Sequence, residues 1–350
     1  MKIVSVVGAR PQFIKLFPIS RAIPDDIEHE IVHTGQHYDE SMSQIFFDEL
    51  EIPRPIINLE VGSGSHAQQT ALMMVGLENA FLARKPDVVL VYGDTNSTIA
   101  AALVASKMHI PLAHLEAGLR SFNRNMPEEL NRIATDHLSD LLLAPTKSAL
   151  DQLISEGLGK NSHYVGDVMV DALYLGKEMI SNLKQQGNFI SSPFIFCTIH
   201  RAENVDEESR MRFILKKLAQ SELQIVLAAH PRLISRLSEF DIDPADFGIK
   251  LIGSQSYLDT IEMLTRCAGV ITDSGGLQKE SYLLGKPTLI VRNETEWPEI
   301  LVGGFCLLDY NLENLNSYQH LSISHDQIEH GLGSGHASAR AIKIVIERLS

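Results

Sequence analysis

The 350-residue sequence lacks the features that mark disulfide-rich secreted proteins, zinc proteins and membrane proteins. Its cysteines, Cys197, Cys267 and Cys306, are odd in number and show no paired spacing, which argues for reduced, mostly buried thiols in the cytosol. No segment reaches the ~18 apolar residues of a membrane helix, and the N-terminal MKIVSVVGARPQ is too short an apolar run for a signal peptide. We therefore expect a cytoplasmic protein without a membrane contact.

Basic residues are scarce relative to acidic ones. The chain has 30 Lys and Arg against 44 Asp and Glu, which gives a formal net charge of −14. A general affinity for nucleic acid is therefore not expected, and an anionic substrate would need a local cluster of basic side chains. The hydrophobic content of 44% is ordinary for a globular protein, and the length is sufficient for two domains.

Two features suggest a cofactor or a metal at first sight, but the surrounding sequence does not support either one. The segment VGSGSHA at 61–67 matches a loose G-x-G-x-x-A dinucleotide fingerprint, but no buried strand is expected before it because Ile56–Glu60 follows Pro53 and Pro55. Fourteen histidines suggest metal binding, yet no paired C-x-x-C spacing occurs. We expect neither a nicotinamide cofactor nor a catalytic metal.

Short apolar runs alternate with amphipathic segments along the whole chain. This alternation predicts parallel strands joined by helices, that is, doubly wound α/β sheets. Turn residues gather at Gly157–Asp171, so we expect two α/β domains at 1–167 and 168–336 with a cleft between them, and a final helix at 337–350 that packs on either one. The expected strands are Ile3–Val7, Ile31–His33, Val88–Tyr92, Pro111–Leu115, Leu141–Ala144, Tyr164–Val165, Phe194–Ile199, Ile225–Ala229, Lys250–Ile252, Val270–Thr272, Thr288–Val291 and Phe305–Leu308.

The stretch GVITDSGGLQKESYLLGKP at 269–287 predicts a strand, a glycine turn and a helix. Such a turn brings backbone N–H groups and the positive end of a helix dipole to one point, where a phosphate binds well. Gly275 and Gly276 would let the anion come close, Ser274 would add a hydroxyl donor, and Glu280 could accept a sugar hydroxyl one turn into the helix. The alternative is an ordinary strand-to-helix turn.

Polar residues end several other expected strands. Ligands of parallel α/β sheets collect at the carboxyl ends of the strands. Arg10 and Lys15 follow the first strand as candidate phosphate partners, Asp94 and Glu116 follow two later strands, and His200 closes a strand of the second half. Carboxylates buried in a cleft acquire shifted pKa values and become candidate acids and bases.

Each of these residues also has a structural interpretation. Asp94 lies where helix caps occur, and Glu128 and Glu129, in the MPEELNR segment, lie in a first helical turn where acids complement the dipole. Strand-end histidines are often hydrogen-bonded structural residues, and three are assigned to that class: His33, His37 and His114.

Nine motifs follow one another in the order that is typical of a known family, and the resemblance covers roughly residues 2–348. The chain resembles the non-hydrolysing UDP-N-acetylglucosamine 2-epimerase family. The resemblance implies a fold of glycosyltransferase type B, with two Rossmann-like domains and a nucleotide sugar in the interdomain cleft, and a cytosolic enzyme that is usually homodimeric and free of nicotinamide. The motifs are VVGARPQFIK, HTGQH, YGDTNST, HLEAGLRS, MPEELNR, APT, TIHRAEN, ITDSGGLQKESYLLGKP and VRNETEWPE.

The resemblance also implies a reaction. In the family, UDP leaves C1 of the sugar as the C2 proton is removed, which gives a 2-acetamidoglucal; UDP then adds back, and a proton returns to the opposite face of C2. Such chemistry needs acids and bases near C2 and stabilisation of the departing diphosphate. The family's catalytic positions correspond to Asp94, Glu116, Glu128 and His200. Its UDP-sugar positions correspond to Arg10, Lys15, Ser274, Gly275, Gly276 and Glu280, with Arg132 and Gln255 as weaker matches.

The sequence departs from better known family members at three charged positions. Those members have RPEAIK, QEE and TERPE where this chain has RPQFIK, QKE and TEWPE, which places Gln12, Lys279 and Trp297 near the expected sugar or diphosphate. Chains of this subtype also resemble epimerases that act on UDP-2,3-diacetamido-2,3-dideoxyglucuronic acid, and Lys279 is the candidate partner of that sugar's carboxylate. The residues of a second, allosteric site known in some bacterial members do not match cleanly around His37–Gln44.

Two further alternatives stay open. A hydrolysing relative would release free N-acetylmannosamine and UDP. A catalytically silent sugar-nucleotide sensor, or a glycosyltransferase of the same fold, would need the anion-binding turn but not Asp94, Glu116 and Glu128 together.

Overall fold

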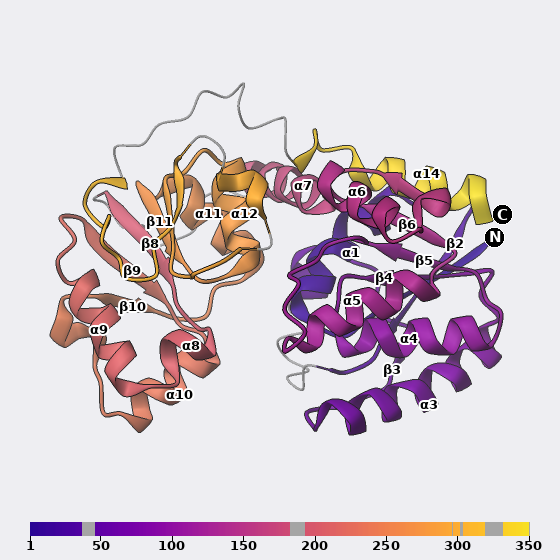
Figure 1. Ribbon diagram of the computed structural model, residues 1–350, viewed down its shortest axis with the longest axis horizontal. Coiled ribbons are helices and arrows are strands. Elements are labelled where there is room, and N and C mark those ends of the chain that lie inside the picture. Colours follow the sequence, from indigo (N-terminus) through magenta and orange to yellow (C-terminus); the bar gives the residue numbers. More distant parts are fainter. Residues whose placement is uncertain (37–45, 183–192, 296, 302–303, 319–331, 350) are drawn as a thin grey trace. The chain divides into compact units, whose positions relative to one another are not determined.

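The computed structural model describes residues 1–36, 46–182, 193–295, 297–301, 304–318 and 332–349. The chain forms two compact units, Met1–Leu175 with Leu332–Ser350, and Gly176–Gly331. Each unit is built on one parallel sheet with helices on it (Figure 1). The expected architecture of two doubly wound α/β domains is confirmed, whereas the cleft between them stays a prediction.

The sheet of the first unit has seven strands in the order β3-β2-β1-β4-β5-β6-β7. The order reverses between β1 and β4, which pair with each other directly through contacts such as Ile3 with Val88. Such a reversal leaves the loops after β1 and β4 pointing apart, so a crevice can form at the carboxyl ends of these strands. The strands are β1 Lys2–Val7, β2 Glu28–His33, β3 Ile57–Asn58, β4 Val88–Tyr92, β5 Leu112–Leu115, β6 Leu141–Ala144 and β7 Ser162–Tyr164.

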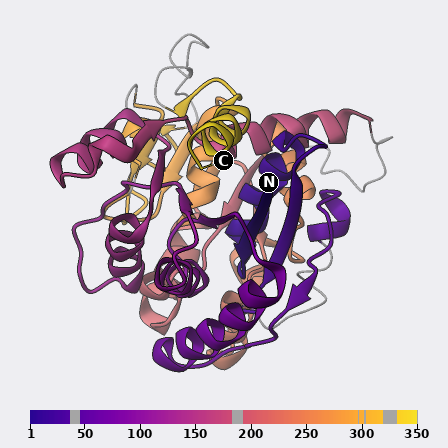
Figure 2. The ribbon, with the colours of Figure 1, turned by 90° about the vertical axis from the view of Figure 1, so that its right-hand side faces the viewer.

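Helices cover both faces of this sheet. Apolar side chains of α3 and α4 form a buried cluster with Val4, Val6 and Val89 of the sheet. The C-terminal helix α14 lies beside α1 (Figures 1 and 2), and the Asp171 carboxylate accepts hydrogen bonds from the backbone N–H groups of Ala337 and Ser338 at its start. The C-terminal helix therefore belongs to the first unit. The helices of this unit are α1 Arg10–Ala22, α3 His66–Arg84, α4 Asn96–Lys107, α5 Pro127–Leu138, α6 Lys147–Ser155, the 3-10 turn η1 Gly159–Asn161 and α14 Ala337–Leu349, and α7 Val168–Asn182 continues into the second unit.

The second unit repeats the plan. Its sheet has six strands in the order β10-β9-β8-β11-β12-β13, so the order reverses between β8 and β11. The strands are β8 Phe194–Thr198, β9 Gln224–Ala228, β10 Lys250–Ile252, β11 Gly269–Thr272, β12 Thr288–Ile290 and β13 Cys306–Leu308. The helices are α8 Ala202–Val205, α9 Glu208–Leu218, α10 Pro231–Glu239, α11 Tyr257–Arg266 and α12 Gly275–Leu283, with 3-10 turns η2 Pro244–Phe247 and η3 Pro298–Leu301.

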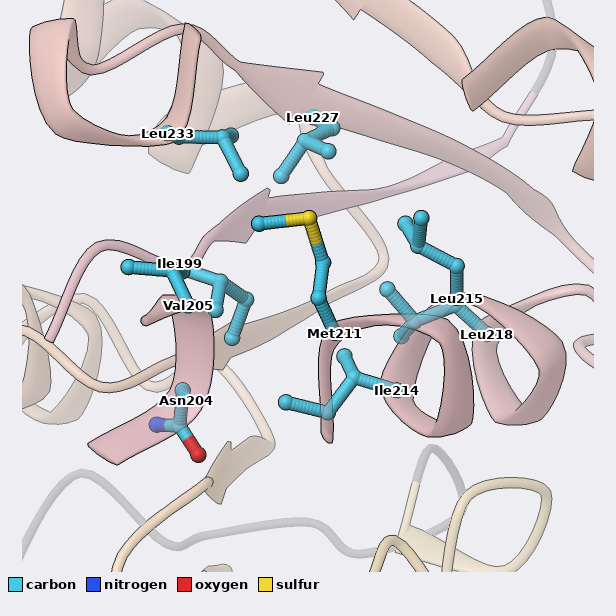
Figure 3. A pocket seen from close by; sticks show the side chains of 9 residues that line it. All are labelled: Ile199, Asn204, Val205, Met211, Ile214, Leu215, Leu218, Leu227 and Leu233. Atoms are coloured by element: carbon cyan, nitrogen blue, oxygen red, sulfur yellow. The ribbon is translucent and has the colours of Figure 1, made fainter. Parts of the chain in front are cut away.

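The core of the second unit is apolar and closely packed. A cavity of ≈ 10 Å³ lies inside it, with the Met211 side chain of α9 among apolar neighbours such as Leu227 and Leu233 (Figure 3). A cavity of this size and lining is a packing void, because it holds at most one water and offers that water almost no polar partners. The amide of Asn204 points away from the apolar side chains (Figure 3), toward the ends of the strands.

The three cysteines are free and buried, as the sequence predicted. Burial raises the pKa of the Cys267 thiol to about 11 and that of Cys306 to about 12. Thiols held in their neutral form behave as small hydrophobic groups and react slowly.

One strand lies where the sequence analysis expected no buried strand. β3 consists of two residues and pairs with the edge of the sheet, Ile57 beside Val32 and Asn58 beside His33. Ile57 is half-buried and Asn58 is exposed, so β3 is a short edge strand, as the prolines before it favour. Among the residues that the structure describes, no helix is both long and apolar enough to cross a membrane, and no three His, Cys, Asp or Glu side chains are grouped as a metal site would need.

Candidate active site

The loop between β1 and α1 is held by Gln12, one of the positions that depart from the family pattern. Its side-chain oxygen accepts hydrogen bonds from the backbone N–H groups of Gly8 (2.8 Å) and Ala9 (3.1 Å). Its side-chain nitrogen donates to the Tyr92 carbonyl at 2.9 Å. A glutamate here could accept the first two bonds but, when ionised, could not donate the third. Gln12 therefore fastens the end of β1 to the end of β4 without adding a negative charge.

Lys15, on α1, forms an ion pair with Glu116, and Nζ lies 2.6 Å from Oε2. Lys15 is only 8% exposed. Burial by itself would lower its pKa, but the carboxylates of Glu116 and Asp94 outweigh that effect and hold the pKa of Lys15 above its ordinary value. Lys15 is therefore a permanent positive charge between two carboxylates at the β1–β4 switch point.

Glu116 has a backbone conformation that is uncommon for its residue type. It follows β5 directly and has φ = 72°, in the left-handed region that non-glycine residues seldom adopt. Its backbone N–H and that of Ala117 donate to the Leu143 carbonyl at 3.1 and 3.2 Å. Residues in such conformations cluster at functional sites because the surrounding structure must offset their strain.

Asp94, which follows β4, is bound to Arg132 of α5. Arg132 places a guanidinium nitrogen 2.7 Å from Asp94 Oδ2 and another 2.9 Å from Glu129 Oε2, and Asn131 donates to the Asp94 backbone carbonyl at 2.9 Å. The structure thus brings Lys15, Asp94, Glu116 and Arg132 into one charged network. The sequence predicted each of them separately.

Glu128 and Glu129 are adjacent on α5 but have different environments. Glu129 is buried and accepts hydrogen bonds from the backbone N–H groups of Ser121 and Phe122. Burial alone would raise its pKa, but these donors and Arg132 hold the pKa of Glu129 below its ordinary value. Glu128 is exposed, and its side chain has no ion pair or hydrogen bond to the described residues. Glu129 is therefore a structural anchor, and Glu128 is the carboxylate that remains accessible.

His114 has the structural environment that was expected for it. Its two ring nitrogens lie 2.7 Å from the Asp136 carboxylate and 2.7 Å from the Gly93 carbonyl. Burial alone would raise the pKa of Asp136, but hydrogen bonds and charge from His114 and Arg120 lower it. This buried cluster fixes Gly93, the residue before Asp94.

In the second unit, Asp273 organises the ends of β8 and β11. It is fully buried, and its carboxylate accepts hydrogen bonds from the backbone N–H groups of His200 and Arg201 and from the Asn204 side chain. The His200 ring also lies near it, with Nδ1 3.4 Å from Asp273 Oδ1. The sequence analysis did not select Asp273, although an aspartate directly after a buried strand was the available signal.

His200 also stacks on a second histidine. The ring centroids of His200 and His230 are 4.5 Å apart at an interplanar angle of 22°. His230 caps α10, where its Nδ1 accepts a hydrogen bond from the Arg232 backbone N–H at 3.2 Å. The orientation of the His200 ring is therefore restricted both by Asp273 and by His230.

The predicted sequence of strand, glycine turn and helix is present at the start of α12, where an anion site stays a prediction. Ser274 is the N-cap, and its hydroxyl makes no capping hydrogen bond to the helix. A Cβ atom added to Gly275 or Gly276 would meet no atom within 4 Å. The first turn of α12 therefore borders open space, and nothing in its own unit requires glycine at these two positions.

Each of the three remaining predicted residues lies after the end of a strand, with Arg10 after β1, Gln255 after β10 and Glu280 on α12 after β11. Arg10 begins α1, and its guanidinium lies 5.0 Å from the centroid of the Phe46 ring. Gln255, in the loop before α11, donates to the Gly253 carbonyl at 2.6 Å. Glu280 is buried on α12. His37–Gln44, where the allosteric motif was sought, lies outside the described residues.

A family model, several relatives and solved structures match this chain. A family model described as UDP-N-acetylglucosamine 2-epimerase matches residues 21–346. A Methanococcus maripaludis protein named UDP-N-acetylglucosamine 2-epimerase homolog is 43% identical over 99% of both chains. A Pseudomonas aeruginosa UDP-2,3-diacetamido-2,3-dideoxy-D-glucuronate 2-epimerase is 44% identical over 87% of both. The crystal structure of Methanocaldococcus jannaschii UDP-GlcNAc 2-epimerase in complex with UDP-GlcNAc and UDP has a TM-score of 0.86 and 37% identity, covering 99% of this chain and 100% of that one.

Proposed function

Because the chain belongs to the UDP-N-acetylglucosamine 2-epimerase family, as its motifs predicted, we propose that it interconverts UDP-N-acetylglucosamine and UDP-N-acetylmannosamine without hydrolysis. In the forward step a base takes the proton from C2, the C2–H electron pair becomes the C1–C2 double bond, and the C1–oxygen bond breaks to release UDP. In the return step C2 receives a proton on its other face, and a UDP oxygen forms the bond to C1 again.

The observation that carries this proposal is the network of Lys15, Asp94 and Glu116 at the β1–β4 switch point. Removal of a proton beside an acetamido group needs a positioned base, and its return needs an acid. Two carboxylates beside a buried cation supply groups for both steps, and the cation stabilises negative charge that develops nearby. Proton transfer by side chains then inverts C2 without a change of oxidation state.

The start of α12 is the proposed site of the diphosphate. Backbone N–H groups at a helix N-terminus favour a phosphate, and the space beside Gly275 and Gly276 allows it to approach closely. The solved relative from Methanocaldococcus jannaschii is described as a complex with UDP-GlcNAc and UDP, which supports a UDP-sugar as the ligand class.

The test is turnover in heavy water with no added nicotinamide cofactor. The mechanism predicts one deuterium at C2 of the product and of the recovered substrate. Asp94→Asn and His200→Ala should each lower turnover by ~10²-fold or more, the usual scale for loss of an acid–base group. Epimerisation with the original hydrogen kept at C2 would refute the mechanism, and accumulation of free N-acetylmannosamine with UDP would establish the hydrolysing alternative.

A second candidate substrate is UDP-2,3-diacetamido-2,3-dideoxyglucuronic acid. It is favoured by the 44% identity to the Pseudomonas aeruginosa enzyme named for that sugar, and Lys279 of α12 is the candidate partner of its carboxylate that the sequence offers. Product assays on both UDP-sugars should be run side by side with Lys279→Glu. A carboxylate-reading role predicts a much larger loss on the uronic acid, and an equal loss on both sugars would exclude that role.

A further inference from the structure

Two of the three departures from the family pattern meet in one contact. Lys279 lies on α12 and Trp297 lies in the segment after β12, and the Lys279 Nζ atom is 3.6 Å from the centroid of the Trp297 ring. Both side chains are buried, with exposed fractions of 3% and 5%. A cation over an indole face is attracted by the electron density of the ring, and the attraction increases when water is excluded.

Hydrogen bonds reinforce this contact. The Thr295 hydroxyl donates to the Gln278 side-chain oxygen at 2.8 Å, and the Trp297 backbone N–H donates to the Thr295 hydroxyl at 3.2 Å. Residues 295 and 297 are therefore attached to α12 through Gln278 and Lys279. The same helix begins at Gly275 and Gly276 and carries Glu280, so this attachment fixes the helix that bears the proposed diphosphate site.

We propose that Lys279 and Trp297 are one coupled pair of positioning residues, which sets the affinity of the α12 N-terminus for the diphosphate of the UDP-sugar. The ligand assigned to that helix rests on the proposed function. A glutamate at 279 with an arginine at 297, the combination in the QEE and TERPE motifs, would replace the cation–π contact by an ion pair between the same two positions. Either combination at positions 279 and 297 should support UDP binding, whereas one residue from each combination should not.

Single exchanges should therefore be damaging. Lys279→Glu places a carboxylate against the negative face of the indole, and Trp297→Arg places two cations together, each away from water. Each single variant should raise the Kd for UDP by about tenfold or more, and the double variant should return to within about threefold of the wild type, because contacting residues are strongly coupled in double-mutant cycles.

The experiment is a double-mutant cycle with UDP titration calorimetry and thermal unfolding on the full chain. Lys279→Arg keeps a cation over the indole and should retain the wild-type affinity. Lys216→Glu makes the same charge reversal on the exposed face of α9 and is the matched control. A positioning role also predicts that KM for the UDP-sugar rises in the single variants while kcat changes less, and that the double variant recovers both KM and Tm.

Two results would overturn the proposal. One is additivity, in which the double variant binds UDP no better than the weaker single variant. The other is wild-type UDP affinity in both folded single variants. Neither readout requires turnover. A wild-type protein that epimerises no UDP-sugar would therefore refute the proposed function, while the cycle in UDP binding and Tm would still decide on the pair.

Discussion

Replacement of Gly276 by alanine tests whether the bound ligand, rather than the fold, requires glycine at this position. Gly276 lies in the first turn of α12, outside the left-handed region of φ, and an added Cβ would have no neighbour within 4 Å. Alanine at such a position restricts the unfolded chain and should stabilise the protein by ~0.4–1 kcal/mol. For a domain of this size that is a rise in Tm of about 1–4 °C.

The same methyl group should weaken UDP binding. A phosphate oxygen bound to the N–H groups of this turn would occupy the space into which the Cβ projects. We expect the Kd for UDP to rise at least tenfold, which is ~1.4 kcal/mol, and Gly276→Val should weaken binding further. Tm by calorimetry and Kd by titration should therefore both rise, so that stability increases while affinity for UDP falls, and a destabilised protein would not show this combination.

Gly64→Ala is the matched control for this experiment. Gly64 lies just before α3, its φ is likewise outside the left-handed region, and a Cβ there would meet nothing closer than Gln68 Oε1 at 3.8 Å. This variant should leave UDP affinity unchanged. If folded Gly276→Ala and Gly276→Val bind UDP as tightly as the wild type, the diphosphate does not lie at the start of α12.

Two further results are expected. Burial alone would raise the pKa of Asp136, but His114 and Arg120 hold it below its ordinary 3.8. The stability that this carboxylate contributes is present above pH 3.8 and is lost as the pH falls through its lower folded value. The urea midpoint should therefore hold from pH 7 to pH 5 and fall below pH 4, and an unchanged midpoint below pH 4 would contradict the assigned cluster. His230→Asn keeps a capping acceptor for the Arg232 backbone N–H but removes the ring stacked on His200. Turnover should therefore fall while Tm and UDP affinity stay near wild type. A loss of Tm without loss of turnover would show that His230 acts only as a helix cap.

Most strands were predictable because they are short buried apolar runs that end in polar or glycine residues, whereas β7 is half-buried and β10 is mostly exposed. The carboxyl ends of the strands stay the predicted place of the site, and the sheet order reverses at β1–β4 and at β8–β11, where ligands of such sheets collect. β3 was harder to predict because two residues after a pair of prolines carry no periodic pattern. Its pairing depends on β2, which lies more than 20 residues earlier.

The sequence could not show which of two adjacent glutamates is buried. Glu128 and Glu129 both occupy the first turn of α5, where dipole arguments treat them alike. The difference comes from Ser121 and Phe122, loop residues whose N–H groups reach only Glu129. Asp273 was missed for a similar reason, because its donors come from residues some 70 positions earlier. Burial of a carboxylate is decided by distant donors, which a local motif does not reveal.

The two switch points provide different kinds of chemistry. At β1–β4 the polar groups are charged side chains, with Lys15, Asp94, Glu116 and Arg132 in one network. At β8–β11 the helix start has no charged residue in its first turn, and its donors are backbone N–H groups beside an aspartate that is already saturated by hydrogen bonds. The carboxylates of Asp94 and Glu116 can exchange protons, whereas backbone N–H groups can only bind. Under the proposed mechanism, substitutions in the first network should therefore lower kcat, and substitutions at the start of α12 should raise KM and Kd, with His200 as the exception that carries proton chemistry in the second unit.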